Sequence, residues 1–138
     1  MSSAPDWPCI SVVMPVRNEA AFIARSLGAM LAQDYPPDRM EIIIVSDGST
    51  DQTPRILADA AAADDRVKAC LVAANRGKAA SLNDGVAAAQ GELIVFADAR
   101  QTFAPDVLAR LAENFADPAV GSVSGELVLT AGEAGVAA

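Results

Sequence analysis

Apolar and polar residues follow one another along this chain in blocks that predict five strands separated by four helices. The apolar runs are short and rich in β-branched residues, which is typical of strands covered on both faces. The predicted strands are 10–16, 42–45, 67–72, 93–97 and 120–128. The stretches between them have apolar residues at helical spacing or helix-start signals, and the predicted helices are 20–33, 53–63, 78–90 and 105–115.

Turn and cap residues define several of these boundaries. Residues 34–38 contain two prolines, which remove backbone donors and end the first helix. Thr53 followed by Pro54 is typical of an N-cap and a first helical position. Gly91 follows the third helix where a glycine with left-handed backbone is common.

The order of elements predicts an α/β fold, a Rossmann-like, mainly parallel sheet with helices on both faces and right-handed crossovers. Such sheets bind ligands outside the carboxyl ends of their strands, where the strand order reverses. Polar residues follow closely after Met14, Val45 and Phe96, which end three of the predicted strands. We therefore expect a binding site at this edge of the sheet.

Composition narrows the classes of function. The chain has 138 residues, 52% of them hydrophobic, which is enough for one domain with a buried core. A formal charge of −8 disfavours nucleic acid as a partner. The absence of histidine excludes Ser-His or Cys-His catalysis, and the two cysteines lack metal-site spacing, so we expect them to be reduced and packed in the core. With no signal peptide pattern and no apolar run of roughly 18 residues, we expect a cytoplasmic domain.

The polar residues after the first two strands have a binding and a structural interpretation. Asn18 and Glu19 can face the cleft or simply cap the next helix. Asp47 leaves the second strand where its carboxylate could accept hydrogen bonds from a base or ribose, and Gly48 permits a tight turn. Residues 49–51 can cap the following helix, so the alternative is a loop rich in capping residues.

Two further segments carry charges that suggest a ligand. Asp98 follows a buried strand, so its carboxylate needs a cation, a cluster of hydrogen-bond donors or a metal. The side chain of Arg100 would point to the same face of the sheet as that of Asp98 if the strand continued. An internal Asp98–Arg100 pair is the alternative. Arg76 and Lys78 precede or begin a helix, where cations oppose the helix dipole unless a phosphate lies nearby. Solvated side chains are the alternative there.

Motifs of other nucleotide-binding and hydrolytic families are absent. The chain has neither GxxxxGK[ST] nor GxGxxG, which disfavours a P-loop and a dinucleotide site. Residues 121–125 miss the GxSxG pattern because Val123 stands at the nucleophile position.

In this order, the strand-end segments resemble the inverting glycosyltransferases of family 2, which have the GT-A nucleotide-sugar fold. The segments that carry the resemblance are 12–19, 44–51, 75–83 and 96–100, and the likeness extends over about residues 9–130. It implies a nucleobase and ribose pocket lined by Pro15, Val16, Arg17 and Glu19. It also implies that Asp47 reads the base, that Lys78 lies near the donor, and that Asp98 lies near the diphosphate and a Mg or Mn ion.

The sequence departs from this family in two respects. Arg100 replaces the second acid of the DxD motif and cannot ligate a metal, which puts metal use in doubt. Arg100 could instead face the diphosphate or an acidic partner. The family's general base and later motifs have no match, so no catalytic residue is assigned here. We expect the chain to hold the donor-binding half and to show little or no transfer alone.

The resemblance also implies partners and location. The expected partners are a nucleotide-sugar donor and a saccharide or lipid-linked acceptor, with the whole protein at the inner face of the cell membrane. Family habit favours a UDP-sugar as the donor, with GDP and dTDP sugars as alternatives. The expected organisation is an extension (1–8), a truncated GT-A-like domain (9–130) and a frayed tail (131–138), with self-association through a sheet edge near 120–128. A non-catalytic nucleotide-binding module and a structural α/β domain are the alternatives.

Overall fold

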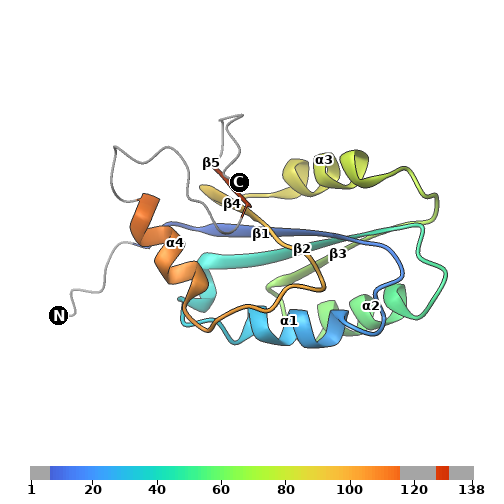
Figure 1. Ribbon diagram of the computed structural model, residues 1–138, viewed down its shortest axis with the longest axis horizontal. Helices are drawn as coiled ribbons and strands as arrows, with labels where there is room; N and C mark the ends of the chain where they lie inside the picture. Colours follow the sequence, from blue (N-terminus) through green and yellow to red (C-terminus); the bar gives the residue numbers. More distant parts are fainter. Residues whose placement is uncertain (1–6, 116–126, 131–138) are drawn as a thin grey trace.

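The computed structural model describes residues 7–115 and 127–130, and in this part of the chain five strands form a sheet with the order β3-β2-β1-β4-β5 (Figure 1). The strands are β1 (Ile10–Val16), β2 (Met40–Asp47), β3 (Val67–Val72), β4 (Leu93–Phe96) and β5 (Leu127–Thr130). The helices are α1 (Ile23–Leu31), α2 (Thr53–Ala63), α3 (Lys78–Ala88) and α4 (Val107–Phe115), with a short 3-10 helix at Pro37–Arg39. Strands β1 to β4 pair in parallel, and β5 pairs antiparallel with β4.

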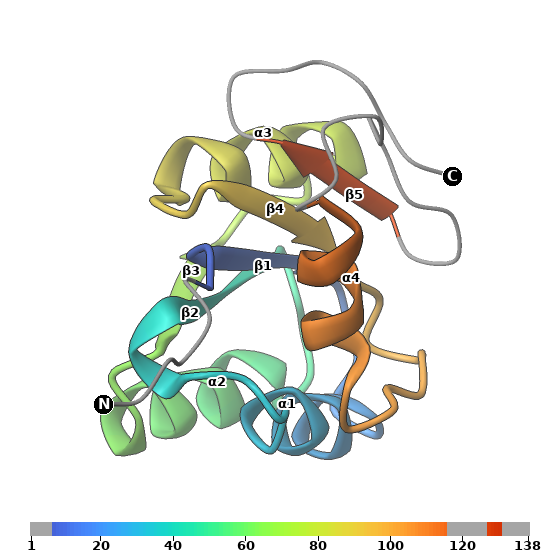
Figure 2. The ribbon, with the colours of Figure 1, turned by 90° about the vertical axis from the view of Figure 1, so that its left-hand side faces the viewer.

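Helices cover both faces of the sheet, as the sequence predicts. Figure 2 shows α3 on one face and α1 and α2 on the other, with α4 packed beside β4 and β5. Gly85 lets α3 lie close to the sheet, because a Cβ on this residue would overlap the side chain of Val13. The predicted α/β class, with its mainly parallel sheet, is confirmed.

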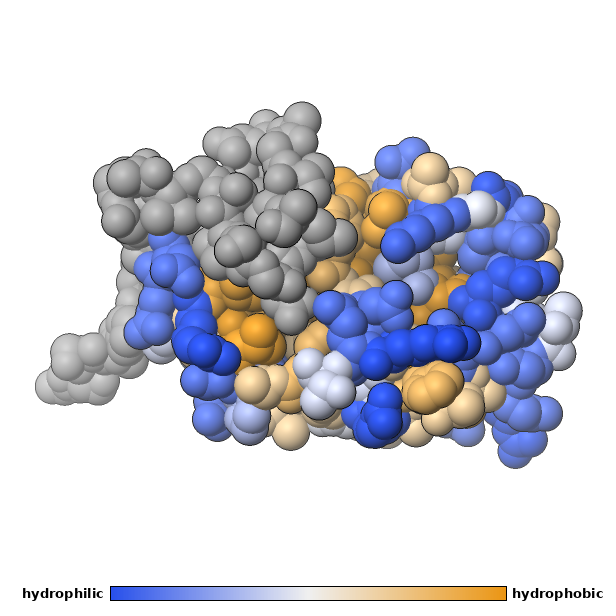
Figure 3. Space-filling view, viewed as in Figure 1, coloured by the Kyte–Doolittle hydropathy of each residue, from blue (hydrophilic) through white to orange (hydrophobic). Residues whose placement is uncertain are grey.

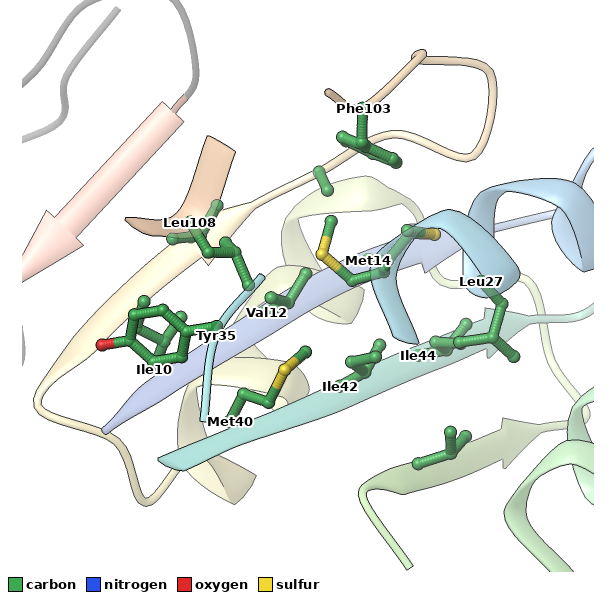
Figure 4. Packing of buried hydrophobic residues seen from close by; sticks show 14 of the residues in the cluster. Ile10, Val12, Met14, Leu27, Tyr35, Met40, Ile42, Ile44, Phe103 and Leu108 are labelled. Carbon is green, nitrogen blue, oxygen red and sulfur yellow. The ribbon is translucent and has the colours of Figure 1, made fainter. Parts of the chain in front are cut away.

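The core explains why the strand segments are continuously apolar. Every other residue of β1 points to the layer of α1, α2 and α4, where Val12 and Met14 are fully buried among side chains such as Leu27 and Leu108 (Figure 4). Val13, on the opposite face under α3, is also fully buried. Because β1 is covered on both sides, polar groups are excluded from most of its length and gather at its ends.

Several predicted boundaries differ from the structure. Helix α1 begins at Ile23 rather than Ala20, because residues 19–22 form a turn in which the N–H groups of Phe22 and Ile23 both donate to the Glu19 carbonyl. Thr53 lies inside α2, and its backbone N–H donates to Asp51 Oδ1 at 2.9 Å, so Asp51 takes the capping role expected of Thr53.

Gly91 follows α3 as predicted, but not as a residue with left-handed backbone. This glycine does not have a positive φ, but a Cβ on it would lie 2.7 Å from the backbone nitrogen of Ser11. The position therefore requires glycine for close approach of two backbones. Cys9 and Cys70 are free thiols, as expected, but they are partly buried rather than fully in the core. Of the predicted fifth strand, residues 120–126 lie outside the described residues, as do residues 1–6 and 131–138.

Candidate functional site

The strand order reverses between β1 and β4, and the loops that follow these strands meet at the carboxyl edge of the sheet. Strand β1 has β2 on one side and β4 on the other, all parallel. Hydrophilic side chains dominate this end of the molecule, on the right of Figure 3. The crevice between diverging loops at such a reversal is where sheets of this type bind ligands.

Asn18 joins the loops after β1 and β2. Its Oδ1 accepts from the backbone N–H of Thr50 at 2.7 Å, and its own N–H donates to Ser49 Oγ at 3.0 Å. Two further backbone N–H groups of the first loop donate to side chains that follow β2, from Glu19 to Thr53 Oγ1 at the start of α2 and from residue 20 to the Asp51 carboxylate. Asn18 has a φ of +54°, which asparagine tolerates better than most residues. Its side chain therefore ties two loops together and does not cap α1.

Asp47 joins the loop after β2 to the loop after β3. It is the last residue of β2 and is only 5% exposed. Its Oδ1 accepts from the backbone N–H of Arg76 at 2.9 Å, and its Oδ2 accepts from that of Gly77 at 2.8 Å. A carboxylate oxygen can accept more than one hydrogen bond, so acceptor capacity is left for a ligand.

Asn75 extends this contact to the first loop. Its side-chain amide is assigned so that the nitrogen donates to Asp47 Oδ2 at 2.8 Å and the oxygen accepts from Arg17 Nε at 3.2 Å. The backbone hydrogen bonds from Arg76 and Gly77, followed by the positive charges of Arg76 and Arg17, hold the pKa of Asp47 below its ordinary value of 3.8. Asp47 is therefore an anion at neutral pH, beside two cations.

Asp98 and Arg100 do not form the internal pair considered above. Strand β4 ends at Phe96, so the alternation that would put both side chains on one side does not persist. Asp98 Oδ1 accepts from the backbone N–H of Arg100 at 2.8 Å, which closes a local turn. The guanidinium of Arg100 instead bonds Glu19 across the reversal point, with Nε 3.1 Å from Oε1, and lies 4.9 Å from the ring centroid of Phe22.

The other predicted site residues differ in exposure. The Val16 side chain belongs to the hydrophobic core and is 4% exposed, and Pro15 is half-buried. Lys78 is exposed at the first position of α3. The structure thus joins Arg17, Asp47 and the loop before Lys78 in one group, and Glu19 with Arg100 in another.

Sequence reasoning missed two participants in this arrangement. Asn75 begins the segment 75–83 that resembles a family motif, but its link between Arg17 and Asp47 depends on how the loop after β3 folds over β2. The spacing of Phe22 from the apolar residues of α1 suggests a core residue, but its ring lies beside the guanidinium groups of Arg25 and Arg100. A phenylalanine just before the first helical turn, next to several charges, is the signal that could have found it.

A shallow pocket of about 210 Å³ lies at the opposite, amino edge of the sheet. Its lining includes Arg39, Glu41 and Gly91, and it contains none of the predicted donor-binding residues. Glu41 there bonds Lys68 Nζ at 2.6 Å and Ser11 Oγ at 2.6 Å. These contacts join β1, β2 and β3, so we interpret this cluster as structural.

A model of the family described as glycosyl transferase family 2 matches residues 11–135 of the chain. The chain belongs to glycosyl transferase family 2. Within this family it is 32% identical over 124 residues to the beta-monoglucosyldiacylglycerol synthase of Synechocystis sp., which covers 88% of this chain and 26% of that protein. It is 30% identical over 131 residues to the glycosyltransferase AglE of Haloferax volcanii, which covers 95% and 43%.

Solved structures of a mannosyltransferase and of TarS have the same fold. The mannosyltransferase PcManGT of Pyrobaculum calidifontis, in complex with GDP-Man and Mn²⁺, is 37% identical with a TM-score of 0.75 over 85% of this chain and 36% of that one. TarS of S. aureus in complex with UDP is 27% identical with a TM-score of 0.71 over 78% and 32%. The chain therefore spans between about a quarter and less than half of the length of these relatives and structures.

The described residues at the carboxyl edge do not form a clamp of two carboxylates in the loop after β4. Among residues 7–115 and 127–130, no three or more His, Cys, Asp or Glu side chains gather as a metal site. Asp98 offers one carboxylate, while Arg100 stands where the second acid would be and is itself a cation. Within the same residues, no helix is long and apolar enough to cross a membrane.

Proposed function

We propose that the whole protein transfers a sugar from a nucleotide-diphosphate donor to an acceptor hydroxyl with inversion, and that this chain forms the donor-binding half. The observation that carries the proposal is the arrangement of Arg17, Asn75 and Asp47, which brings the loops after β1, β2 and β3 to one point at the carboxyl edge. Family membership gives the reaction class, and the edge position agrees with where this fold binds ligands.

The residues divide into two groups by the part of the donor that they suit. Pro15, Val16, Arg17 and Glu19 follow or end β1 and would line the nucleobase and ribose, with Asp47 accepting hydrogen bonds from the base. A carboxylate that is buried and ionised is a directional acceptor for the N–H edge of uracil or guanine. Lys78, Asp98 and Arg100 would lie near the diphosphate.

Donor identity is proposed from the neighbouring structures. One is a complex with GDP-Man and another, TarS, is known in complex with UDP and with UDP-GlcNAc. We favour a UDP-sugar as the donor, and a GDP-sugar is the alternative. The name of one relative, a beta-monoglucosyldiacylglycerol synthase, supports a lipid-linked acceptor, with a saccharide as the other acceptor class. A lipid-linked acceptor agrees with a whole protein that works at the inner face of the cell membrane.

Inverting transfer requires two contributions. The acceptor oxygen forms a bond to the anomeric carbon as the bond from that carbon to the diphosphate oxygen breaks, so negative charge develops on the leaving group and must be stabilised. The acceptor proton must pass to a general base. We assign groups in this chain only to the first contribution, and we expect donor binding with little or no transfer by the 138 residues alone.

The test is titration of the chain with UDP and with GDP, followed by calorimetry or NMR. We expect base-selective binding that Asp47→Asn abolishes, because the amide keeps the size of the side chain but loses its charge and one acceptor. Asp51→Asn is the matched control, since Asp51 also joins two loops but has no proposed contact with the base. Equal loss in both variants would mean that Asp47 acts only by holding the loops.

A second function is favoured by one observation. Asn18, Asp47 and Asp51 all bond neighbouring loops, which is what a purely structural edge, or a non-catalytic nucleotide-binding module, would also require. Absence of binding to any nucleotide supports the structural function. Nucleotide binding by the whole protein without transfer to any acceptor supports the non-catalytic module.

A further inference from the structure

Arg100 occupies the point of the sheet where the strand order reverses. It belongs to the loop after β4, and its Nε lies 3.1 Å and 3.4 Å from the two carboxylate oxygens of Glu19 in the loop after β1. These residues are 81 positions apart in the sequence. The Arg100 side chain is 65% exposed whereas Glu19 is 16% exposed, so the guanidinium reaches outward from a more buried acid.

The surroundings keep this guanidinium in place without covering it. The ring of Phe22 lies 4.9 Å from the Arg100 Cζ on one side, and the Arg25 guanidinium lies 5.5 Å from the same ring. Contacts of a cation with an aromatic face are favourable and restrict its motion. A planar guanidinium held in this way keeps free N–H donors, which match the oxygens of a phosphate in pairs.

Cations and acids are both present at the carboxyl edge, and most of the acids already have partners. Asp47 accepts from backbone donors, Glu19 pairs with Arg100, and Asp51 accepts from Thr53. Arg76 pairs with Asp84 of α3. The exposed cations Lys78 and Arg100 can attract an anionic ligand to this edge.

A bound nucleoside diphosphate brings several negative charges that need compensation at this edge. A metal clamp built from two acids is not available here, since Asp98 has Arg100 where a second acid would stand. Asp98 Oδ1 also already accepts the backbone N–H of Arg100. The side chain that replaces the acid carries one positive charge, which Glu19 balances when no ligand is bound.

We propose that Arg100 binds the donor diphosphate directly, so that this chain binds nucleoside diphosphates without a divalent metal. The inference rests on the proposed donor-binding function and refines it. Without ligand, Glu19 neutralises and positions the guanidinium. When the diphosphate arrives, the exposed face of the guanidinium donates to its oxygens, while Glu19 and Phe22 keep the group at the reversal point.

The experiment is NMR titration of the 138-residue chain with UDP, GDP and the corresponding nucleosides, each in EDTA and in Mg²⁺. We expect the affinity for the diphosphates to be nearly the same in both conditions. Arg100→Ala should weaken diphosphate binding about tenfold or more, the effect of losing charge-assisted hydrogen bonds, and should leave nucleoside binding within about twofold. Arg110→Ala is the matched control, because Arg110 of α4 is 63% exposed, pairs at 3.2 Å with Asp106 just before the helix and has no proposed ligand.

Arg100→Asp restores an acid at the second position of the motif. We expect this variant to bind the diphosphates poorly in EDTA and to recover part of the affinity in Mg²⁺ or Mn²⁺, which reverses the metal response of the original chain. Such a reversal cannot arise from simple loss of folding. It would support the inference even if Arg100→Ala were destabilised.

The outcomes separate the two proposals. Nucleoside and diphosphate binding that requires Mg²⁺, or that Arg100→Ala leaves unchanged, would overturn the role of Arg100 and keep the donor-binding function. Loss of nucleoside binding in Arg100→Ala, or equal loss in Arg110→Ala, would also overturn it. If neither nucleosides nor diphosphates bind under any condition, the donor-binding function fails and the inference fails with it.

Discussion

A Cβ atom on Gly48 would lie 2.6 Å from the backbone nitrogen of Asn75. Gly48 also has a φ of +66°, in the left-handed region that favours glycine. The turn after β2 can therefore pass against the backbone of the loop after β3, and this approach lets Asp47 reach the N–H groups of Arg76 and Gly77. One glycine thus makes the position of the carboxylate possible.

The first prediction concerns this turn. Gly48→Ala should lower the free energy of unfolding by about 2 kcal/mol or more, because it combines left-handed strain with overlap against backbone atoms. Chemical denaturation measures the change. Gly28→Ala is the control, since a Cβ there meets nothing within 4 Å and alanine favours the helix by about 0.5–1 kcal/mol. A Gly48→Ala chain as stable as the original would contradict the tight approach.

The second prediction separates two contributions of Asn18. Asn18→Ala should cost about 2 kcal/mol of stability, from lost acceptor bonds to the loop after β2 and from the left-handed backbone. Asn18→Gly should cost about 1 kcal/mol less, because glycine removes the strain but not the loss of hydrogen bonds. The two variants are compared by denaturant titration. Identical stabilities would mean that the backbone strain contributes nothing.

The third prediction is a pH dependence at Asp47. Its pKa is lowered in the folded state by backbone N–H donors and nearby cations, so the unfolded state binds more protons in acid. The stability that the carboxylate contributes is therefore fully present above the ordinary pKa of 3.8, and it is lost as the pH falls through the lower folded pKa. Asp47→Asn should be less stable than the original chain at pH 7, and the difference in Tm should shrink steadily below about pH 4.

Thermal unfolding from pH 7 to pH 3 measures that difference. Asp51 and Asp64 also have lowered pKa values, because each accepts hydrogen bonds, from Thr53 and Arg66 respectively. The whole chain should therefore lose stability in acid, and only the comparison with the variant isolates Asp47. A Tm difference that stays constant from pH 7 to pH 3 would show that the charge of Asp47 has no part in it.

The fourth prediction is that removing the charge of Lys78 stabilises the fold but weakens the binding of UDP. Lys78 begins α3, where a cation opposes the helix dipole, so Lys78→Ala should raise the free energy of unfolding by about 0.5 kcal/mol. The same variant should weaken UDP binding about fivefold if the cation lies near the diphosphate. Lys68→Ala removes the same charge from the other end of the sheet, where Lys68 pairs with Glu41, and should leave UDP affinity unchanged. Equal UDP affinity in all three chains would remove Lys78 from the donor site.

Self-association stays a prediction as well. Most of the segment near 120–128 that we expect to mediate it lies outside the described residues, and so does the tail at 131–138. Light scattering across a range of protein concentrations tests it, and a monomer at every concentration would contradict it.

Most of the fold could be predicted because buried parallel strands leave a strong sequence signal. Strand β1 has the predicted bounds, since it is a buried apolar run that ends at a turn. Strand β3 has them as well, although it is an edge strand in which only Val67 is buried. The start of α1 could not be predicted in the same way. The N–H groups of Phe22 and Ile23 both donate to the Glu19 carbonyl, so residues 19–22 form a turn that the apolar spacing of the segment does not distinguish from a first helical turn.

The site was predictable in its position but not in its contacts. Strand-end rules identify Asp47 and Asp98 without any knowledge of the fold around them. The partner of Arg100 could not be predicted in this way. The predicted direction of its side chain assumes that the strand continues past Asp98, but β4 ends at Phe96. A turn closed by Asp98 rotates the next residues, and Glu19 is reached from an element 81 positions away.

The hydrogen bonds between Asn18 and residues 49–51 have a consequence for protein engineering. Chimaeras that exchange a single loop with a relative would separate donors from acceptors that fold together. Donor preference should therefore be transplanted by moving the loops after β1 and β2 as a pair, with the residues from Asn75 to Gly77 included. Single-loop exchanges should yield poorly folded hybrids whatever the chemistry of the inserted side chains.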